Sequence, residues 1–323
     1  MGVLTELSLE DAGGLCERWG VALRTLAPVA AGSVNSSFAL DGTDGARWFL
    51  RVYEEQGVDG ARREAAMLAH LAARGVPTPF PRALRDVPGT YVQLHRDKPA
   101  VLFPWVPGTM ACQRSVTAGR AFAVGQALAR VHRAGEGLVG LQPSRFGPEA
   151  LRLRLEALRG VDLTRELRGV VDGLLARIEA LDPRTTPRDQ GLIHGDLFRD
   201  NVLWEGDALT ALLDFESASL GSFVFDLLVT VLAWCYGDAL DLALARRMVE
   251  GYRAERALSA REVAELPEAA RRAALRFTVT RVTDFELRRG AGGVYKDYRR
   301  FLGRLQALEA LGSPRLLEGL GLS

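Results

Sequence analysis

The stretch Leu192-Ile-His-Gly-Asp-Leu-Phe-Arg-Asp-Asn-Val-Leu203, followed closely by Leu212-Leu-Asp-Phe-Glu216, decides how this chain folds. An apolar segment leads into a polar loop that carries Asp196, and a second apolar run follows at once. A third apolar run ends at Asp214. The pattern predicts a strand, a loop and two further strands, with one carboxylate in the loop and another at the end of the last strand.

These residue types suit phosphoryl transfer from a metal-bound nucleotide. Catalytic loops of the protein-kinase type carry an Asp that accepts the proton of the acceptor hydroxyl, and an Asn that holds Mg²⁺ follows five residues later. Asp196 and Asn201 have this spacing. Mg²⁺ prefers oxygen ligands, and an amide with a carboxylate such as Asp214 leaves room for water and phosphate. We therefore predict Asp196 as the base, Asn201 and Asp214 as metal ligands, and His194 as a brace of the loop.

The competing interpretation is that His-Gly-Asp forms only a tight turn and that Asp214 only terminates a strand. An isolated His-x-Asp often has that meaning, because short motifs arise by chance. Here four elements occur in the required order, which argues against the simpler interpretation.

The run from His194 to Asn201 resembles the catalytic loop of the aminoglycoside phosphotransferase and choline kinase superfamily, and most closely that of the bacterial homoserine kinases. The resemblance extends over residues 25–310 and includes Trp48–Glu54 and Ala274–Arg281. It implies an α+β, two-lobed, protein-kinase-like fold. Residues 1–104 would form a small antiparallel-sheet lobe that binds nucleotide, and residues 105–323 a mainly helical lobe that carries the catalytic and acceptor residues.

The same resemblance implies transfer of the γ-phosphoryl group of ATP, with Mg²⁺, to the hydroxyl of L-homoserine. Gly195 and Glu216 are closer to the generic superfamily, since many homoserine kinases have Ala at the first position and an aromatic residue after Asp-Phe. The alternatives are a kinase for an aminoglycoside, choline or an amino alcohol, and a pseudokinase-like nucleotide-binding protein. No Ala-Pro-Glu segment of a protein kinase follows Asp214.

The N-terminal part contains the residues expected to bind nucleotide. The loop before the second predicted strand offers a glycine for close approach of the backbone, and small polar side chains as phosphate donors. Arg51 lies where a kinase keeps its phosphate-binding Lys, and Glu64 lies on the helix that supplies the partner of that Lys. The main chain at Leu102 and Phe103 is expected to contact adenine. The loop residues in this prediction are Gly32, Ser33, Asn35, Ser36 and Ser37.

L-Homoserine carries an ammonium, a carboxylate and a hydroxyl, so its site needs at least one cation and one hydrogen-bond acceptor. The candidates are Arg199, Glu216, Arg281 and Asp284. Taken singly, each is also typical of a surface ion pair. Asp226 interrupts an apolar helix, and a buried carboxylate needs partners. We predict that Asp226 is structural and accepts hydrogen bonds from the backbone of the catalytic loop.

The composition fits a cytoplasmic enzyme that acts on a small molecule. Lysine and arginine number 41 against 40 acidic residues, and no basic stripe carries interleaved aromatics, which argues against a nucleic-acid partner. The three cysteines are scattered and favour reduced thiols. No signal peptide and no apolar run long enough to span a membrane is expected. The chain is expected to be a monomer or a homodimer.

Periodicity predicts the remaining elements. Helices are expected at 8–19, 58–74, 116–134, 148–159, 164–181, 222–236, 240–255, 261–288 and 293–310, and strands at 89–94 and 100–103. A hairpin turn is expected at Asp41-Gly42, because Asp-Gly between apolar runs is a strong hairpin signal. The stretch Pro104–Gly108 is predicted as the hinge between lobes.

Overall fold

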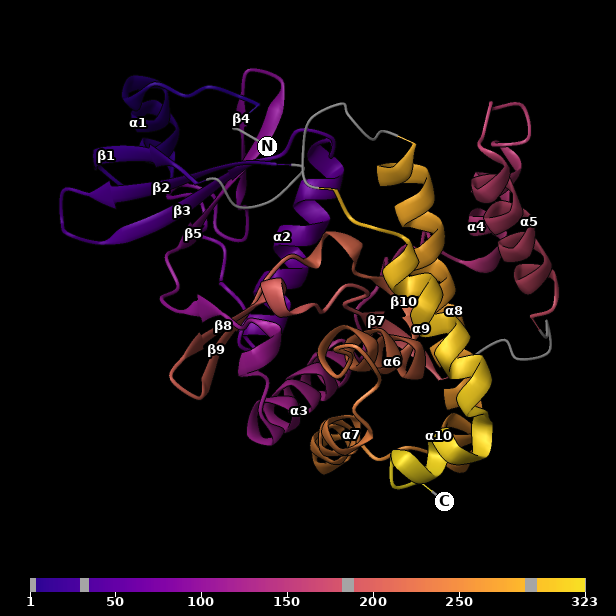
Figure 1. The fold of residues 1–323 in the computed structure, drawn as a ribbon. Helices are drawn as coiled ribbons and strands as arrows, with labels where there is room; N and C mark the ends of the chain where they lie inside the picture. The colour runs from indigo at the N-terminus through magenta and orange to yellow at the C-terminus, as the bar shows by residue number, and fades with distance from the viewer. Residues whose placement is uncertain (1–3, 30–34, 182–188, 288–294, 323) are drawn as a thin grey trace. The chain divides into compact units, whose positions relative to one another are not determined.

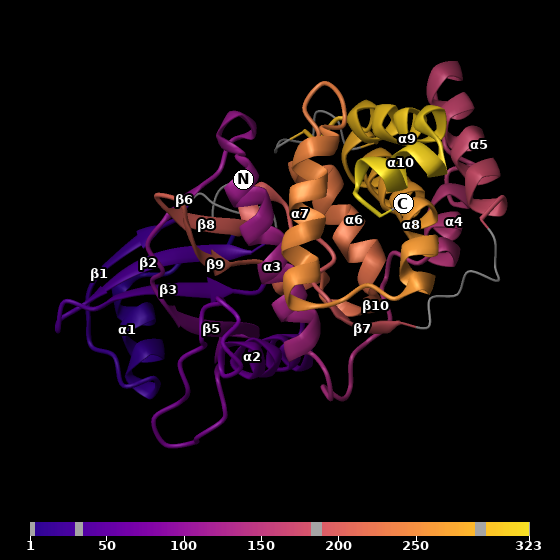
Figure 2. The same ribbon diagram turned by 90° about the horizontal axis from the view of Figure 1, so that it is seen from below.

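The computed structural model describes residues 4–29, 35–181, 189–287 and 295–322. Contacts divide these residues into two compact units. The first unit consists of the described residues up to Thr109 together with Leu203–Glu216, and the second of the remaining described residues. Figures 1 and 2 show the elements of each unit.

The first unit is built on a five-stranded antiparallel sheet with the strand order β1-β2-β3-β5-β4. Phe38, Leu50 and Leu102 occupy paired positions on three neighbouring strands, so their side chains form one apolar row. Helix α1 packs on this row through Leu15 and Trp19. The strands are β1 (Leu23–Pro28), β2 (Ser36–Gly42), β3 (Arg47–Val52), β4 (Val92–His95) and β5 (Lys98–Pro104).

The two helices of this unit begin where the sequence predicts. Helix α1 (Leu9–Arg18) starts with a capping box, in which Ser8 and Asp11 satisfy each other's backbone amides. Helix α2 (Val58–Ala72) packs against β4 and β5. The predicted small antiparallel-sheet unit is thus confirmed.

The first hairpin turns later than predicted. Gly42 remains in the sheet opposite Leu23, and the chain reverses over residues 43–46. Gly45 supplies the positive φ of +83°, and the Asp44 carboxylate accepts a hydrogen bond from the amide of Ala46 at 3.0 Å. The side chain of Asp44 therefore stabilises this turn, and the Asp-Gly pair does not form it.

The segment Leu203–Glu216 belongs to the first unit although it is distant from the rest of that unit in sequence. It carries most of a three-stranded sheet with the order β6-β8-β9. Its Leu212 amide donates to the Pro77 carbonyl at 2.6 Å, and the hydroxyl of Thr210 donates to the Pro107 carbonyl at 3.1 Å. The strands are β6 (Thr109–Met110), β8 (Val202–Glu205) and β9 (Ala208–Leu212).

The second unit is mainly helical and is organised around α6 (Phe223–Trp234), which is almost wholly buried. A helix that is apolar on all sides is typical of the centre of a domain. It packs against α3, α7, α8 and the antiparallel pair of β7 (Gln190–Ile193) and β10 (Ser219–Ser222). The other helices are α3 (Ala118–Ala134), α4 (Pro148–Glu156), α5 (Arg165–Glu179), α7 (Leu242–Glu255), α8 (Ala260–Arg281), α9 (Arg299–Leu311) and α10 (Ser313–Gly319).

The predicted helices are present, with differences near the C-terminus. Helix α8 ends at Arg281 and continues as a π-helical turn, Val282–Glu286. Helix α9 starts at Arg299, later than predicted, and α10 is an additional short helix. The expected α+β class, with one unit on an antiparallel sheet and one mainly helical unit, is confirmed. Among the described residues, no helix is long and apolar enough to cross a membrane.

Candidate active site

Asp226 anchors the loop that carries Asp196. It is fully buried on α6, and its carboxylate accepts hydrogen bonds from the backbone amides of His194 and Gly195, both at 2.7 Å. These are the contacts that the sequence predicts for it. Because two consecutive amides bind one rigidly placed carboxylate, the entry to the loop has a fixed direction.

His132, which the sequence does not single out, completes this network. Its Nε2 lies 3.0 Å from the Asp226 carboxylate and its Nδ1 lies 2.8 Å from the Tyr252 hydroxyl. Burial lowers the pKa of His132, which favours the neutral ring with its proton on Nε2. Burial alone would raise the pKa of Asp226, but the hydrogen bonds from His132 and Gly195 lower it below the usual value. Asp226 is therefore ionised.

Asn201 holds the other end of the catalytic loop. Its side-chain Nδ2 donates to the backbone carbonyl of Asp196 at 2.8 Å, across the 3₁₀ turn Arg199–Asn201. This hydrogen bond assigns the amide nitrogen to the protein, so the amide oxygen is the atom that can coordinate a metal. Gly195 has a φ of +77°, and a Cβ there would lie 2.9 Å from the Ser217 carbonyl oxygen, which explains the glycine.

Two further buried side chains support the loop from the helices. Arg276 on α8 is 3% exposed and donates to the carbonyl of Gly195. Burial lowers the pKa of Arg276 to about 10, so the guanidinium stays charged at neutral pH. Trp234 is fully buried and donates to the Leu197 carbonyl at 3.0 Å. Both residues position the loop backbone. His194 contributes its Nδ1, which accepts from the Asp196 amide at 3.3 Å.

The first unit holds a second group of charged residues. Arg51 on β3 and Glu64 on α2 form the expected ion pair at 3.2 Å, and Arg51 also lies 3.7 Å from the carboxylate of Glu216. The Arg51 Nε and the Glu64 Oε2 are buried and have no hydrogen-bond partner among the described residues. A partly buried guanidinium with an unused donor fits a phosphate oxygen as its ligand.

Burial shifts the pKa of Glu64 strongly. It raises that pKa to about 7, and the neighbouring carboxylates of Glu216 and Asp214 act in the same direction, against the opposing effect of Arg51. For Arg51, burial lowers the pKa, but Tyr53 and the carboxylates outweigh it, so the pKa is above its ordinary value. Arg51 is therefore always charged, whereas Glu64 titrates near neutral pH.

The predicted nucleotide loop is only partly described. Gly32 and Ser33 lie outside the described residues. Asn35 accepts from the Glu54 amide at 3.2 Å and donates to the Glu216 carboxylate, so it joins the group around Arg51.

The prediction for Ser36 is corrected. Its hydroxyl is fully buried, accepts from the amides of Leu4 and Thr5, both at 2.9 Å, and donates to Glu54. Because these hydrogen bonds use the donor and acceptor sites of the hydroxyl, Ser36 is not available to bind a phosphate. Ser37 is also buried, in β2 opposite Arg51.

Leu102 and Phe103 lie in β5 as expected, with Phe103 packed on Phe49 at a ring-centroid distance of 6.5 Å. The carbonyl of Leu102 already accepts a hydrogen bond from the Arg82 amide at 2.8 Å. The expected contact of this backbone with adenine therefore has to use amide and carbonyl groups other than the Leu102 carbonyl.

Asp214 has an unusual backbone conformation. Its φ is +61°, which places a non-glycine residue in the left-handed region. Such conformations cost on the order of 1–3 kcal/mol and concentrate at functional sites.

No group of three or more His, Cys, Asp or Glu side chains that could hold a metal occurs among the described residues.

The four acceptor candidates have different surroundings. Arg281 donates to the Asp297 carbonyl at 3.0 Å, and Arg199 donates to the Ala233 carbonyl. Asp284 forms an ion pair with Arg154 at 2.9 Å and is partly exposed. Glu216 belongs to the first unit, where it contacts Arg51 and Asn35, so its contacts differ from those expected of an acceptor residue.

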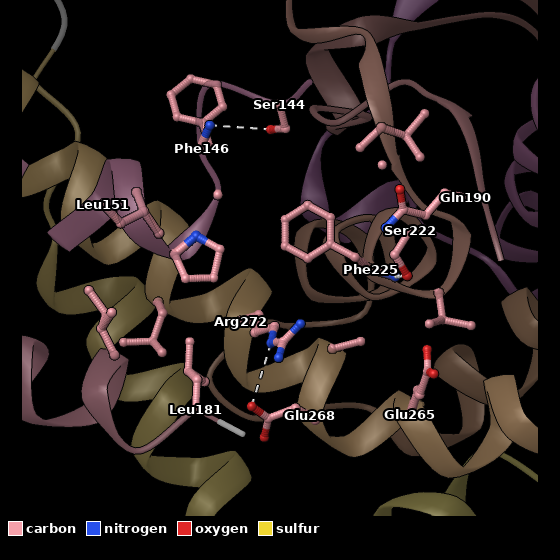
Figure 3. A pocket seen from close by; sticks show the side chains of 18 residues that line it. Ser144, Phe146, Leu151, Leu181, Gln190, Ser222, Phe225, Glu265, Glu268 and Arg272 are labelled. Carbon is pink, nitrogen blue, oxygen red and sulfur yellow. Dashed lines mark hydrogen bonds and ion pairs between the residues drawn. The ribbon is translucent and has the colours of Figure 1, made fainter. Parts of the chain in front are cut away.

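A cavity of about 190 Å³ lies within the second unit, against the β7–β10 strand pair and α8 (Figure 3). Apolar residues such as Phe146, Leu151 and Phe225 line most of it, and the Glu268–Arg272 ion pair lies at one side. None of the residues predicted to be catalytic or metal-binding lines this cavity. We therefore do not assign the reaction to it.

With the loop, its anchors and the Arg51 group defined, comparison with known proteins places the chain. The model of the phosphotransferase enzyme family matches residues 25–260. The chain belongs to this family. A homoserine kinase of Methylocella silvestris is 32% identical over 98% of this chain and 99% of its own length. One of Azorhizobium caulinodans is 34% identical over 89% of each chain. The protein is thus an enzyme, a small-molecule kinase that phosphorylates a hydroxyl group.

Solved structures agree on the fold of this phosphotransferase. A spectinomycin phosphotransferase, solved with ADP and spectinomycin, has a TM-score of 0.68 at 13% identity and covers 98% of both chains. An amicoumacin kinase, solved with AMP-PNP and Ca²⁺, has a TM-score of 0.66 at 15% identity over 89% of both chains. At these identities the likeness shows the fold alone.

Proposed function

We propose that this phosphotransferase transfers the γ-phosphoryl group of ATP to the hydroxyl of L-homoserine. Full-length relatives that are about one-third identical and are named homoserine kinase support the acceptor. Structural neighbours solved with ADP and AMP-PNP support an adenine nucleotide. The reaction would make this enzyme part of threonine biosynthesis, since O-phosphohomoserine is the precursor of threonine.

The orientation of the Asn201 amide carries the mechanistic part of the proposal. The side-chain nitrogen of Asn201 donates a hydrogen bond to the Asp196 carbonyl, so the side-chain oxygen remains available as a metal ligand. The same hydrogen bond holds Asn201 close to Asp196. Asn201 and Asp214 would hold Mg²⁺, and the bound ion would supply positive charge against the negative charge that develops on the transferred phosphoryl group. Asp196 orients the acceptor hydroxyl and accepts its proton late in the transfer.

Arg51 would bind phosphate oxygens, with Glu64 and Glu216 keeping the guanidinium in place. Asn35 donates a hydrogen bond to Glu216, so we assign Glu216 to this phosphate-side group and not to the acceptor site. Asp214 adjoins Glu216 in sequence and acts electrostatically on Arg51, which is consistent with a metal ligand next to the phosphate-binding residue.

An acceptor panel tests the proposal. ADP release is measured with Mg²⁺ and ATP against L-homoserine, L-serine, choline, ethanolamine and two aminoglycosides. We expect turnover with L-homoserine at a kcat/KM at least tenfold above that of any other member. Preference for another acceptor would overturn the substrate assignment and leave the kinase assignment intact.

The Asp196→Asn variant tests the base. Asparagine keeps the shape of the side chain but cannot accept the proton, so turnover is expected to fall by 10²-fold or more, while ATP still binds. Calorimetric titration with AMP-PNP and Mg²⁺ checks that binding. Retained turnover would remove Asp196 from its proposed role.

A further inference from the structure

Three arginines of the second unit lie within electrostatic reach of a fourth, Arg304, beside the catalytic loop. Arg199 follows Phe198 in that loop, Arg281 ends α8, and Arg300 and Arg304 lie on α9. Arg281, Arg300 and Arg199 all act on Arg304, each lowering its affinity for its proton. Helices α8 and α9 pack side by side (Figures 1 and 2). A gathering of like charges is unfavourable unless an anion joins it.

Arg304 is the most unusual member of this cluster. It is 5% exposed, and its guanidinium packs over the rings of Phe301 and Tyr236, at 4.2 Å and 4.8 Å from their centroids. Among the described residues, its Nε has no hydrogen-bond partner, and no carboxylate forms an ion pair with its guanidinium. Burial lowers the pKa of Arg304 to about 9, so the group remains charged at neutral pH. Arg304 is thus a buried cation that no carboxylate of the described residues neutralises.

Arg281 lies on the same aromatic ring. Its guanidinium is 4.5 Å from the centroid of Phe301, and its one hydrogen bond to the described chain goes to the Asp297 backbone carbonyl. The Asp297 carboxylate is directed to Arg299 instead, at 3.6 Å. Arg281 stands where α8 changes into a π-helical turn, a distortion that is frequent at functional sites.

The shared ring connects both arginines to the catalytic loop. Phe301 packs on Phe277 at 4.9 Å, and both rings pack on Phe198, at 6.1 Å and 4.9 Å respectively. Phe198 is two residues beyond Asp196, and Asp196 in turn acts electrostatically on Arg281. Arg281 and Arg304 therefore contact the same aromatic cluster that packs against the loop carrying Asp196.

We propose that Arg281 and Arg304 form the subsite that binds the carboxylate of the acceptor. The inference rests on the proposed function and adds the residues that select the acceptor. Two guanidinium groups provide donors in planar forks that match a carboxylate. The same cluster repels polycations. The subsite therefore favours a hydroxyl-bearing amino acid over an aminoglycoside, and over an amino alcohol that lacks the carboxylate.

A comparison of two acceptors that differ only in the carboxylate tests this. L-Homoserine and 3-aminopropan-1-ol are assayed with wild-type enzyme, Arg304→Met and a control, Arg299→Met. Arg299 lies on the same helix but is exposed and paired with Glu166 at 3.1 Å. For Arg304→Met we expect kcat/KM for L-homoserine to fall roughly 100-fold, with kcat/KM for the amino alcohol and KM for ATP unchanged. The control should leave all three within about twofold.

Thermal unfolding separates binding from a structural role. Methionine fills similar volume without a buried charge, so the unfolding midpoint of Arg304→Met should equal or exceed that of wild type. An equal loss of activity on both acceptors, or a lowered midpoint with a raised KM for ATP, would overturn the subsite. Wild-type preference for 3-aminopropan-1-ol would overturn it as well.

Failure of the proposed function gives a different result. If wild-type enzyme turns over neither acceptor, L-homoserine is the wrong substrate. Anion binding at the subsite is then measured with sulfate as the probe. Titration with sulfate should raise the unfolding midpoint of wild type more than that of Arg304→Met, because other anion sites are common to both proteins. Equal shifts would contradict an anion subsite at Arg304.

Discussion

Asp226 is the residue on which the direction of the catalytic loop most directly depends. Its two carboxylate oxygens receive the amides of His194 and Gly195, and His132 supplies a third hydrogen bond. None of these donors can reach water in the folded protein, because the whole group is buried. The network is therefore costly to break at any one point.

The Asp226→Asn variant should reveal this cost. Asparagine replaces one acceptor oxygen by a donor that faces another donor, so we expect about 3 kcal/mol of lost stability and a parallel loss of kcat. Thermal unfolding and the ADP-release assay measure the two effects. The exposed Asp172→Asn on α5 is the control and should stay within about 0.5 kcal/mol. A fully stable and active Asp226→Asn would show that the loop is held by other contacts.

Glu64 should make the use of ATP depend on pH. Its pKa is about 7 in the folded protein, so the ion pair with Arg51 forms fully only above neutral pH. We expect kcat/KM for ATP to rise with pH and level off above pH 7, with a slope approaching tenfold per unit on the acid side. Glu64→Gln should lack this rise. An identical pH profile in the variant would exclude Glu64 as its source.

The contribution of Glu64 to the free energy of unfolding changes with pH in the opposite direction to kcat/KM for ATP. Because its folded pKa lies above the ordinary 4.5, its contribution to stability is present below pH 4.5 and is lost as the pH rises through about 7. Glu64→Gln should therefore gain stability relative to wild type between pH 5 and pH 8. Unfolding midpoints of both proteins across that range measure the difference.

At the scale of elements, α3 and α7 depend on glycine for their close contact (Figure 1). A Cβ at Gly125 of α3 would overlap the backbone carbonyl of Met248, and one at Gly251 of α7 would overlap the carbonyl of Phe122. Side chains at these positions would force the helices apart. The α3–α7 contact also positions His132 and Tyr252, which lie on these two helices.

Gly125→Ala is therefore expected to lose about 1–3 kcal/mol, because backbone atoms cannot move aside as a flexible side chain can. The matched control is Gly169→Ala on the exposed face of α5, where a Cβ would meet nothing within 4 Å. That variant should gain about 0.5–1 kcal/mol, since alanine is the better helix former. Thermal unfolding compares the two, and a neutral Gly125→Ala would contradict the close packing.

At the scale of the whole molecule, the sequence predicts most elements because apolar periodicity is a local property. The Arg51–Glu64 pair and the Asp226 contacts could also be predicted, since both follow from a motif and its position on an element. Arg276, Arg304 and His132 could not, because a polar residue in a helical pattern usually marks the solvent face. Only the tertiary packing shows that these three are buried.

Two other differences between the predictions and the structure also arise from tertiary contacts. The placement of Leu203–Glu216 with the N-terminal unit depends on contacts distant in sequence, such as that of Leu212 with Pro77. The burial of Ser36 under the Leu4–Thr5 segment is likewise a tertiary effect that small polar residues near a glycine do not indicate. Residues that suit a phosphate loop also suit a buried hydrogen-bond network.

Phosphorus NMR of a mixture of enzyme, ATP and L-homoserine is the most direct measurement, because it observes the transferred phosphate itself. We predict that the γ-phosphate signal of ATP is replaced by that of a phosphomonoester coupled to a methylene group. Excess EDTA should abolish the change and added Mg²⁺ restore it, whereas Asp196→Asn should leave ATP intact. Inorganic phosphate alone, or unchanged ATP with wild-type enzyme, would contradict phosphoryl transfer to L-homoserine.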